Sequence, residues 1–183
     1  MITRTSRPAR HLLGVALLTL AHAHATAETP APSAFISPED VSWKTNAFAV
    51  ARWKTLVGGI EGGQLPARDV QFGQWELAPG AVYHGHRHAV PELYVVLEGS
   101  VRWQVGEETR DLGPGDTVLT PPNAVHRMEN LGDTPVRTLW FWWAPGGDAS
   151  VFAAPYEFTE PPVPAPPGVG YDDAERLHAA SDG

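Results

Sequence analysis

Short segments of alternating apolar and polar residues, each closed by glycine or proline, dominate this sequence. Glycine and proline contribute 18 residues each to a chain of 183, and turn residues at this frequency leave little length for helices. In Val101–Val105 the apolar residues share one face and the polar residues the other. Such alternation indicates strands with one buried face. The sequence therefore predicts an all-β fold, a sandwich or barrel, of which the double-sheet jelly roll is one form.

The expected strands cover the middle of the chain. They lie at 48–57, 70–77, 92–97, 101–105, 109–112, 117–120, 125–129 and 136–143. These strands predict a β-barrel over residues 46–160, with a flexible arm at 28–45 before it and a Pro-rich tail at 161–183 after it. Because 48–57 is the expected edge strand, we expect a homodimer to pair along it.

The composition excludes several kinds of site and partner. The chain has no cysteine, which excludes disulfides, thiolate zinc sites, iron–sulfur clusters and cysteine nucleophiles. It has 13 basic and 21 acidic residues and a net charge of −8. Nucleic acid needs a basic surface on its partner, so we expect a small-molecule substrate and no nucleic acid.

The first residues have the pattern of a secretory signal peptide. Arg4, Arg7 and Arg10 precede the apolar run 12–20, and small residues at 25–27 suit a cleavage site. The apolar run is much shorter than the roughly 20 residues of a membrane-spanning helix. We therefore predict a signal peptide at 1–27 and a periplasmic or secreted protein with no membrane segment after cleavage.

Three histidines and one glutamate form the candidate metal site. His86 and His88 are two residues apart, so on an extended backbone both imidazoles point to the same side. Glu92 follows after a short loop, and His126 comes from a later strand. This ligand set suits one divalent transition metal (Zn, Mn, Fe, Co, Ni or Cu) and leaves positions open for substrate.

The spacing of these residues resembles the two motifs of the cupin superfamily. The first motif, Gly-x5-His-x-His-x3-Glu-x6-Gly, is matched by Gly80, His86, His88, Glu92 and Gly99. The second, Gly-x5-Pro-x-Gly-x2-His-x3-Asn, is matched by Gly115, Pro121, His126 and Asn130, with Asn123 in place of the third glycine. Asparagine tolerates positive φ better than most residues, so the turn can keep its shape. The resemblance covers residues 70–143 and implies a double-stranded β-helix, the jelly-roll cupin barrel, with a single metal held by those three histidines and Glu92.

A further histidine, His84, has the same strand parity as His86 and His88. On a regular strand its side chain would point to the same side. It is therefore a candidate fifth ligand or catalytic acid/base. The alternative is a histidine at the rim that hydrogen-bonds solvent.

Tyr94 is the candidate catalytic base. It shares the strand parity of Glu92, and a phenol beside a divalent cation can lose its proton well below its usual pKa of about 10. The order His-x-His, Glu-x-Tyr resembles the cupin-type dimethylsulfoniopropionate (DMSP) lyases. That resemblance implies a β-elimination that yields acrylate and dimethyl sulfide, with the tyrosine as base.

An aromatic wall is expected to complete the substrate pocket. Trp103, Phe141 and Trp143 are the predicted lining, since aromatic faces can hold a sulfonium or ammonium group. Trp140 and Trp142 lie on the other face of the same strand, so only one of the two pairs can line the pocket.

Two other function classes stay open. The same ligand set resembles that of mononuclear dioxygenases and decarboxylases such as quercetinases and oxalate-degrading cupins, in which open metal positions accept oxygen or substrate. A non-catalytic cupin that binds metal or a small ligand is the third class. The DMSP-lyase-like enzyme is the favoured hypothesis.

Overall fold

A computed structural model describes residues 35–58, 63, 65, 67–165, 170 and 171, all within one unit that runs from Ala34 to Gly183. The predicted signal peptide at 1–27 lies outside the described residues, as do the first residues of the predicted arm and most of 166–183. Within the described ranges, no helix has both the length and the apolar character that crossing a membrane requires.

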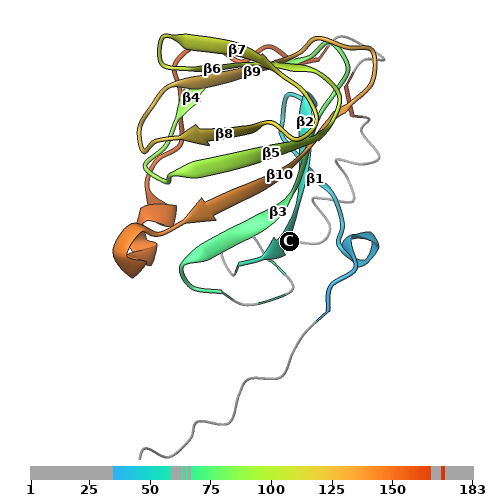
Figure 1. Cartoon of the computed structure of the whole chain (residues 1–183). Helices are drawn as coiled ribbons and strands as arrows, with labels where there is room; N and C mark the ends of the chain where they lie inside the picture. Colours follow the sequence, from blue (N-terminus) through green and yellow to red (C-terminus); the bar gives the residue numbers. More distant parts are fainter. Residues whose placement is uncertain (1–34, 59–62, 64, 66, 166–169, 172–183) are drawn as a thin grey trace, which may run out of the picture. The chain divides into compact units, whose positions relative to one another are not determined.

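Two facing antiparallel sheets make up the described unit (Figure 1). The first, sheet A, has in spatial order β1 (Lys44–Thr45), β2 (Ala51–Val57), β3 (Val70–Leu77), β10 (Val136–Trp143), β5 (Glu92–Glu98) and β8 (Thr117–Thr120). The second, sheet B, has β11 (Glu157–Phe158), β4 (Val82–Arg87), β9 (His126–Asn130), β6 (Val101–Val105) and β7 (Glu108–Leu112). The described helices are short 3-10 turns: η1 (Pro38–Asp40), η2 (Pro145–Gly147) and η3 (Ala149–Ala153). The all-β jelly-roll prediction is confirmed, as a sandwich of two sheets.

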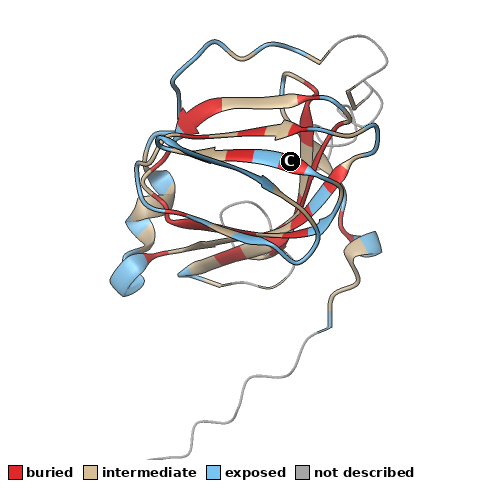
Figure 2. Ribbon diagram, turned by 45° about the horizontal axis from the view of Figure 1, so that its top comes forward, coloured by how far each residue is buried: buried red, intermediate tan, exposed pale blue. Residues whose placement is uncertain are grey.

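The two ends of the sandwich differ in chemistry. At one end, Leu77 pairs with Val136 across β3 and β10, and both side chains are fully buried. At the other end, Trp142 of β10 pairs with Glu92 of β5, and His86 of β4 pairs with His126 of β9. Figure 2 shows buried residues along the strands of both sheets. The apolar end provides the hydrophobic core, and the polar end carries the candidate site.

The eight expected strands are all present with similar bounds, whereas β1, β4 and β11 were not expected. Strand β4 lies in a segment where only an extended backbone around the two histidines was expected. Strand β2 begins at Ala51 because Ala49, with φ of 59°, forms a turn before it. Strand β2 also has β1 and β3 as neighbours, so 48–57 is not the free edge that was predicted. The homodimer stays a prediction.

Part of the predicted flexible arm packs against sheet A. Strand β1 pairs with β2, and the Lys54 ammonium donates to the Pro38 carbonyl at 2.6 Å. The Arg52 guanidinium lies over the Trp43 ring, 4.4 Å from its centroid. These contacts fix the part of the arm that the structure describes. The proline and alanine content of the arm did not indicate them.

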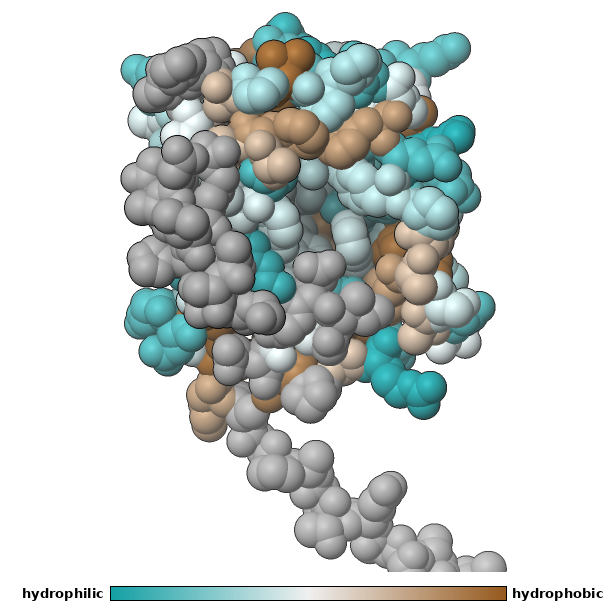
Figure 3. Space-filling model, turned by 180° about the vertical axis from the view of Figure 1, so that it is seen from behind, coloured by the Kyte–Doolittle hydropathy of each residue, from teal (hydrophilic) through white to brown (hydrophobic). Residues whose placement is uncertain are grey.

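The surface of the unit mixes polar and apolar side chains. On the face seen from behind, hydrophobic side chains gather in a band across the upper part, with a hollow below it (Figure 3).

The turn at Asn123 has φ of 63°, as expected for an asparagine in place of glycine. Its N–H donates to the His88 carbonyl at 2.8 Å, and this bond joins the turn before β9 to the histidine segment after β4.

Candidate metal centre

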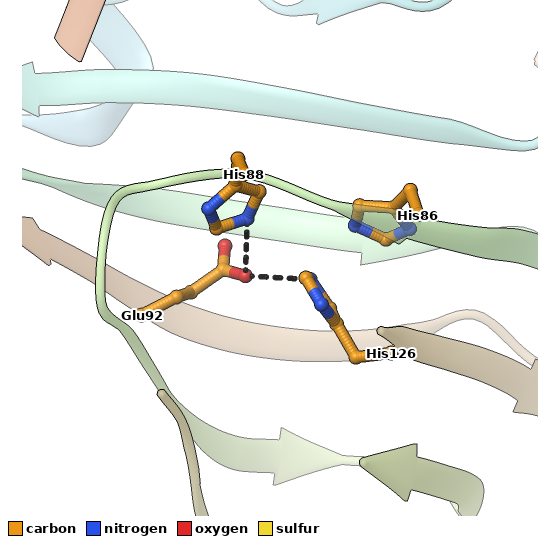
Figure 4. A group of neighbouring side chains, drawn as sticks. All are labelled: His86, His88, Glu92 and His126. Atoms are coloured by element: carbon orange, nitrogen blue, oxygen red, sulfur yellow. Dashed lines mark hydrogen bonds and ion pairs between the residues drawn. The ribbon is translucent and has the colours of Figure 1, made fainter. Parts of the chain in front are cut away.

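Strand pairing brings the predicted metal ligands together. His86 of β4 and His126 of β9 lie directly opposite each other, with ring centroids 3.9 Å apart. His88 follows β4 by one residue, and Glu92 opens β5 in the facing sheet. Three imidazoles from the sheet B side thus meet one carboxylate from sheet A (Figure 4). One ligand atom from each residue can be chosen so that all lie within 4.8 Å of one another.

Backbone carbonyls fix the tautomer of all three imidazoles. The Nδ1 atom lies 2.8 Å from the His84 carbonyl in His86, 2.8 Å from the Val90 carbonyl in His88 and 3.0 Å from the Ala124 carbonyl in His126. A carbonyl only accepts hydrogen bonds, so each Nδ1 carries a proton and donates it. The Nε2 lone pairs are then left for a ligand at the centre of the cluster, which is the usual arrangement of metal-binding histidines.

The electrostatics of the cluster fit a cation at its centre. Oxygen Oε2 of Glu92 lies 3.2 Å from Nε2 of His88 and 3.1 Å from Nε2 of His126. All four side chains of the cluster are buried, and Nε2 of His126 has no hydrogen-bond donor or acceptor partner. With a proton on each Nδ1, the Nε2 atoms of His88 and His126 face the Glu92 carboxylate, and these are the nitrogens that a bound cation would take as ligands.

The pKa values of the cluster are consistent with a neutral imidazole beside an ionised carboxylate. Burial, together with the neighbouring His126, lowers the pKa of His86 to about 3. Burial alone would raise the pKa of Glu92, but contacts with His126 and His88 lower it below its ordinary value. A neutral imidazole and an ionised carboxylate are the forms in which these side chains bind metals. The donor set is therefore compatible with one divalent metal ion.

A cavity of about 320 Å³ opens beside the cluster and has an aromatic lining. His86, Glu92 and Asn46 line it together with nine aromatic residues: Phe48, Trp53, Trp75, Tyr83, Tyr94, Trp140, Trp142, Tyr156 and Phe158. None of these described lining residues is a lysine or an arginine. The cavity thus combines a candidate metal site with aromatic faces, and its described lining has no lysine or arginine.

Tyr94 lines this cavity, as predicted. Its ring is buried between Trp103 and Trp75, whose centroids lie 4.7 Å and 5.7 Å from its own. Burial and the charge of Glu92 raise the pKa of Tyr94 well above its usual value. In the protein without metal, Tyr94 is therefore a neutral phenol.

The predicted aromatic wall needs a correction. Trp140 and Trp142 line the cavity, because they lie opposite Tyr94 and Glu92 in the pairing of β10 with β5. Phe141 packs instead against Phe72, with centroids 4.4 Å apart, and neither it nor Trp143 is among the lining residues. Trp103 packs against Tyr94 in the core and does not line the cavity either. The alternation along β10 was visible in the sequence, but its register against β5 was not.

His84 does not point into the cavity, because a β-bulge between Tyr83 and His86 reverses the strand parity. Tyr83 lines the cavity in its place. The Nδ1 atom of His84 lies 3.3 Å from Oε1 of Glu160. The expectation of a fifth ligand or catalytic acid/base assumed a regular strand, and the irregular strand does not bring His84 to the cluster.

Two cavity residues that the sequence did not indicate come from the segment after β10. Tyr156 stacks on His86 and His88, with centroids 4.9 Å and 5.5 Å away, and its hydroxyl bonds that of Tyr83 at 3.1 Å. Phe158 follows in β11, opposite His86 of β4. No motif or periodicity marks this segment, so only its pairing with β4 reveals its place beside the site.

Comparison with known proteins identifies a family from the sequence. Residues 73–142 match the family model described as "Cupin domain". The DMSP lyase DddW of Ruegeria pomeroyi is 30% identical over 106 residues, which cover 56% of this chain and 68% of that protein. Germin-like protein subfamily T member 3 of Arabidopsis thaliana is 39% identical over 71 residues, 34% of this chain and 30% of that protein.

Solved structures support the fold. A chain from the crystal structures of the DMSP lyases RdDddP and RnDddQII aligns with a TM-score of 0.54 and 24% identity. That alignment covers 66% of this chain but only 63% of the solved one, which is less than two thirds of its length. The polyketide cyclase RemF of Streptomyces resistomycificus aligns with a TM-score of 0.57 and 17% identity, over 72% of this chain and 88% of that one. At these identities the likeness concerns the fold alone.

Proposed function

This chain belongs to the cupin family, and on that basis we propose that it is a metal-dependent lyase acting on a small carboxylate that carries an onium group, as DMSP does. The observation that carries the proposal is the cavity, in which a cluster of three histidines and Glu92 adjoins aromatic rings without any lysine or arginine among the described lining residues. The similarity to DddW, whose name states DMSP lyase activity, supports the same choice.

The two ends of such a substrate suit the two parts of the cavity. Its carboxylate would lie at the His/Glu cluster, where a divalent cation offers positive charge. Its sulfonium group would lie against aromatic faces, which attract cations by about 0.5–2 kcal/mol each. Trp53, Trp75 and Trp140 are cavity residues that can provide those faces.

Tyr94 is the proposed base of the reaction. A divalent cation held by His86, His88, Glu92 and His126 supplies Lewis acidity, which weakens the C–H bond next to a bound carboxylate and favours the tyrosinate. Tyr94 then takes that proton, the C–H electrons form the double bond of acrylate, and the C–S electrons leave with dimethyl sulfide. Release of the proton to solvent restores Tyr94 for the next cycle.

The decisive experiment compares the three tyrosines of the cavity. Tyr94→Phe should lower dimethyl sulfide release from DMSP by about 10²–10⁴-fold, the usual contribution of a general base, and should leave the metal content unchanged. Tyr83→Phe and Tyr156→Phe are the matched controls, since each removes a cavity phenol that is bonded to the other one. Headspace analysis measures the product, and elemental analysis measures the metal.

Each other outcome has a defined meaning. Loss of release in Tyr83→Phe or Tyr156→Phe, with Tyr94→Phe active, would refute the assignment of the base and keep the lyase. No release from metal-loaded wild-type protein would refute the lyase. Oxygen consumption with a small acid would then favour the dioxygenase alternative, and a filled site without turnover of any small acid would favour a binding protein.

The proposal also covers the identity of the metal and the cellular location of the protein. If the signal peptide at 1–27 is cleaved and the protein loads its metal after export, affinity favours zinc or copper over manganese or iron. We propose zinc, or a mixture with manganese and iron, in the native protein. The N-terminal residue of the native protein, expected at Glu28, checks the export, and homogeneous iron would contradict the metal assignment.

A further inference from the structure

We propose that Trp142 is a positioning residue of the metal centre, which holds one oxygen of Glu92 so that the other oxygen alone is presented to the imidazoles. The inference rests on the metal-binding part of the proposed function and does not depend on the substrate or on the role of Tyr94.

The two oxygens of Glu92 have different neighbours. Oxygen Oε1 accepts a hydrogen bond from Nε1 of Trp142 at 2.7 Å. Oxygen Oε2 lies 3.2 Å from His88 Nε2 and 3.1 Å from His126 Nε2. Figure 4 shows both contacts to the histidines at this one oxygen. Because Oε1 is hydrogen-bonded to Trp142, Glu92 offers a metal only its Oε2 atom.

Strand register sets the position of Trp142. It lies directly opposite Glu92 in the antiparallel pairing of β10 with β5 and opposite Gln71 in the pairing of β10 with β3. Its ring lies 5.1 Å from that of His88, and Trp140 packs edge-on against it at 5.5 Å. The indole therefore contacts two of the four cluster residues from a strand that is paired on both sides.

The indole N–H should affect how tightly Glu92 binds a metal and through how many oxygens. Partners of this kind orient a metal ligand, and their loss commonly costs about 10–100-fold in metal affinity. Without the indole N–H, Oε1 of the buried Glu92 would lose its hydrogen-bond donor. The carboxylate could then turn so that both of its oxygens bind the metal. A single bound oxygen leaves one more coordination position for substrate.

The chain provides a matched control two residues away. Trp140 also lines the cavity, but its Nε1 donates to the Gln74 carbonyl at 3.2 Å rather than to Glu92. Trp142→Phe and Trp140→Phe make the same chemical change on the same face of the same strand. Only the first removes a hydrogen bond to the metal cluster.

The test measures metal binding directly. Co²⁺ affinity is obtained by competition with a chelator, and the visible absorption of bound Co²⁺ reports its coordination. Trp142→Phe should weaken Co²⁺ binding by about 10–100-fold and change the spectrum, whereas Trp140→Phe should leave both unchanged. In a Glu92→Ala background, Trp142→Phe should cause no further loss, because its effect acts through that carboxylate.

Three results would overturn the inference: wild-type affinity and spectrum in Trp142→Phe, equal losses in both tryptophan variants, or an undiminished loss in the Glu92→Ala background. Melting temperatures of the metal-free variants separate a general loss of stability from a local effect on the centre. Absence of Co²⁺ and Zn²⁺ binding in wild-type protein would instead contradict the metal centre itself.

Discussion

Two glutamates on opposite faces of sheet A are equally buried but differ in what balances their charge. Glu76 of β3 and Glu92 of β5 are 3% and 2% exposed. Glu76 faces two guanidinium groups, with Arg52 at 2.7 Å and Arg137 at 2.9 Å, and the Tyr171 hydroxyl at 3.3 Å. Glu92 faces the imidazoles of His88 and His126 and the indole N–H of Trp142.

The difference separates a structural ion pair from a binding site. Fixed cations of the chain compensate the charge of Glu76, so that cluster is complete as it stands. The imidazoles around Glu92 donate from Nδ1 to carbonyls and turn Nε2 toward the carboxylate, so these Nε2 atoms and Oε2 surround one position. A divalent metal at that position would supply at Glu92 the fixed positive charge that the two arginines supply at Glu76.

The largest expected contrast is the response of the two glutamates to metal. At free Zn²⁺ about a thousand times its dissociation constant, wild-type protein should gain about 4 kcal/mol of unfolding free energy. Glu92→Gln should lose most of this gain, because it removes the charged ligand. Without metal, Glu92→Gln should be less stable than wild type, because contacts with His126 and His88 favour the ionised carboxylate in the folded protein and lower its pKa. Thermal melts with and without Zn²⁺ measure both, and an undiminished gain in Glu92→Gln would contradict the ligand assignment.

The matched change at the other glutamate should lower stability but leave the gain from Zn²⁺ intact. Glu76→Gln removes the carboxylate that Arg52 and Arg137 share, at a cost of about 2–3 kcal/mol. This is below the cost for a fully buried pair because Arg137 is half exposed and keeps its ion pair with Glu98. Chemical denaturation should show the same loss in metal-free and metal-loaded protein. A variant that lost the gain from Zn²⁺ would show that the two clusters are coupled.

A smaller expected effect concerns the stability of the metal-free protein at low pH. The pKa of His86 in the folded protein is about 3, whereas the unfolded chain binds this proton near its ordinary value of about 6.5. Between these values the unfolded state holds more protons, so stability falls as the pH falls. Metal-free protein should lose on the order of 2 kcal/mol through His86 between about pH 7 and pH 5. Denaturant titrations should show a weaker acid dependence in His86→Gln, and an unchanged dependence would contradict the lowered pKa.

Local patterns in the sequence were sufficient for much of the fold and for the candidate ligands. Alternation located most strands, and the spacing of His86, His88 and Glu92 predicted a cluster that the structure brings together. These features depend on residues close in the chain, where covalent geometry already sets the direction of each side chain. The positive φ at Asn123 was predictable for the same reason.

The remaining features of the site depend on contacts between distant segments. The bulge before His86 places Tyr83 rather than His84 in the cavity. The register of β10 against β5 places Trp142 rather than Phe141 beside Glu92. Pairing of β11 with β4 brings Tyr156 over the imidazoles. The sequence by itself determined most of the strands, the ligand types and the turns, because each is fixed within a few residues. Only the tertiary structure decided which side chains surround Glu92, because strand register is settled by packing over whole sheets and a shift of one residue moves a side chain to the other face.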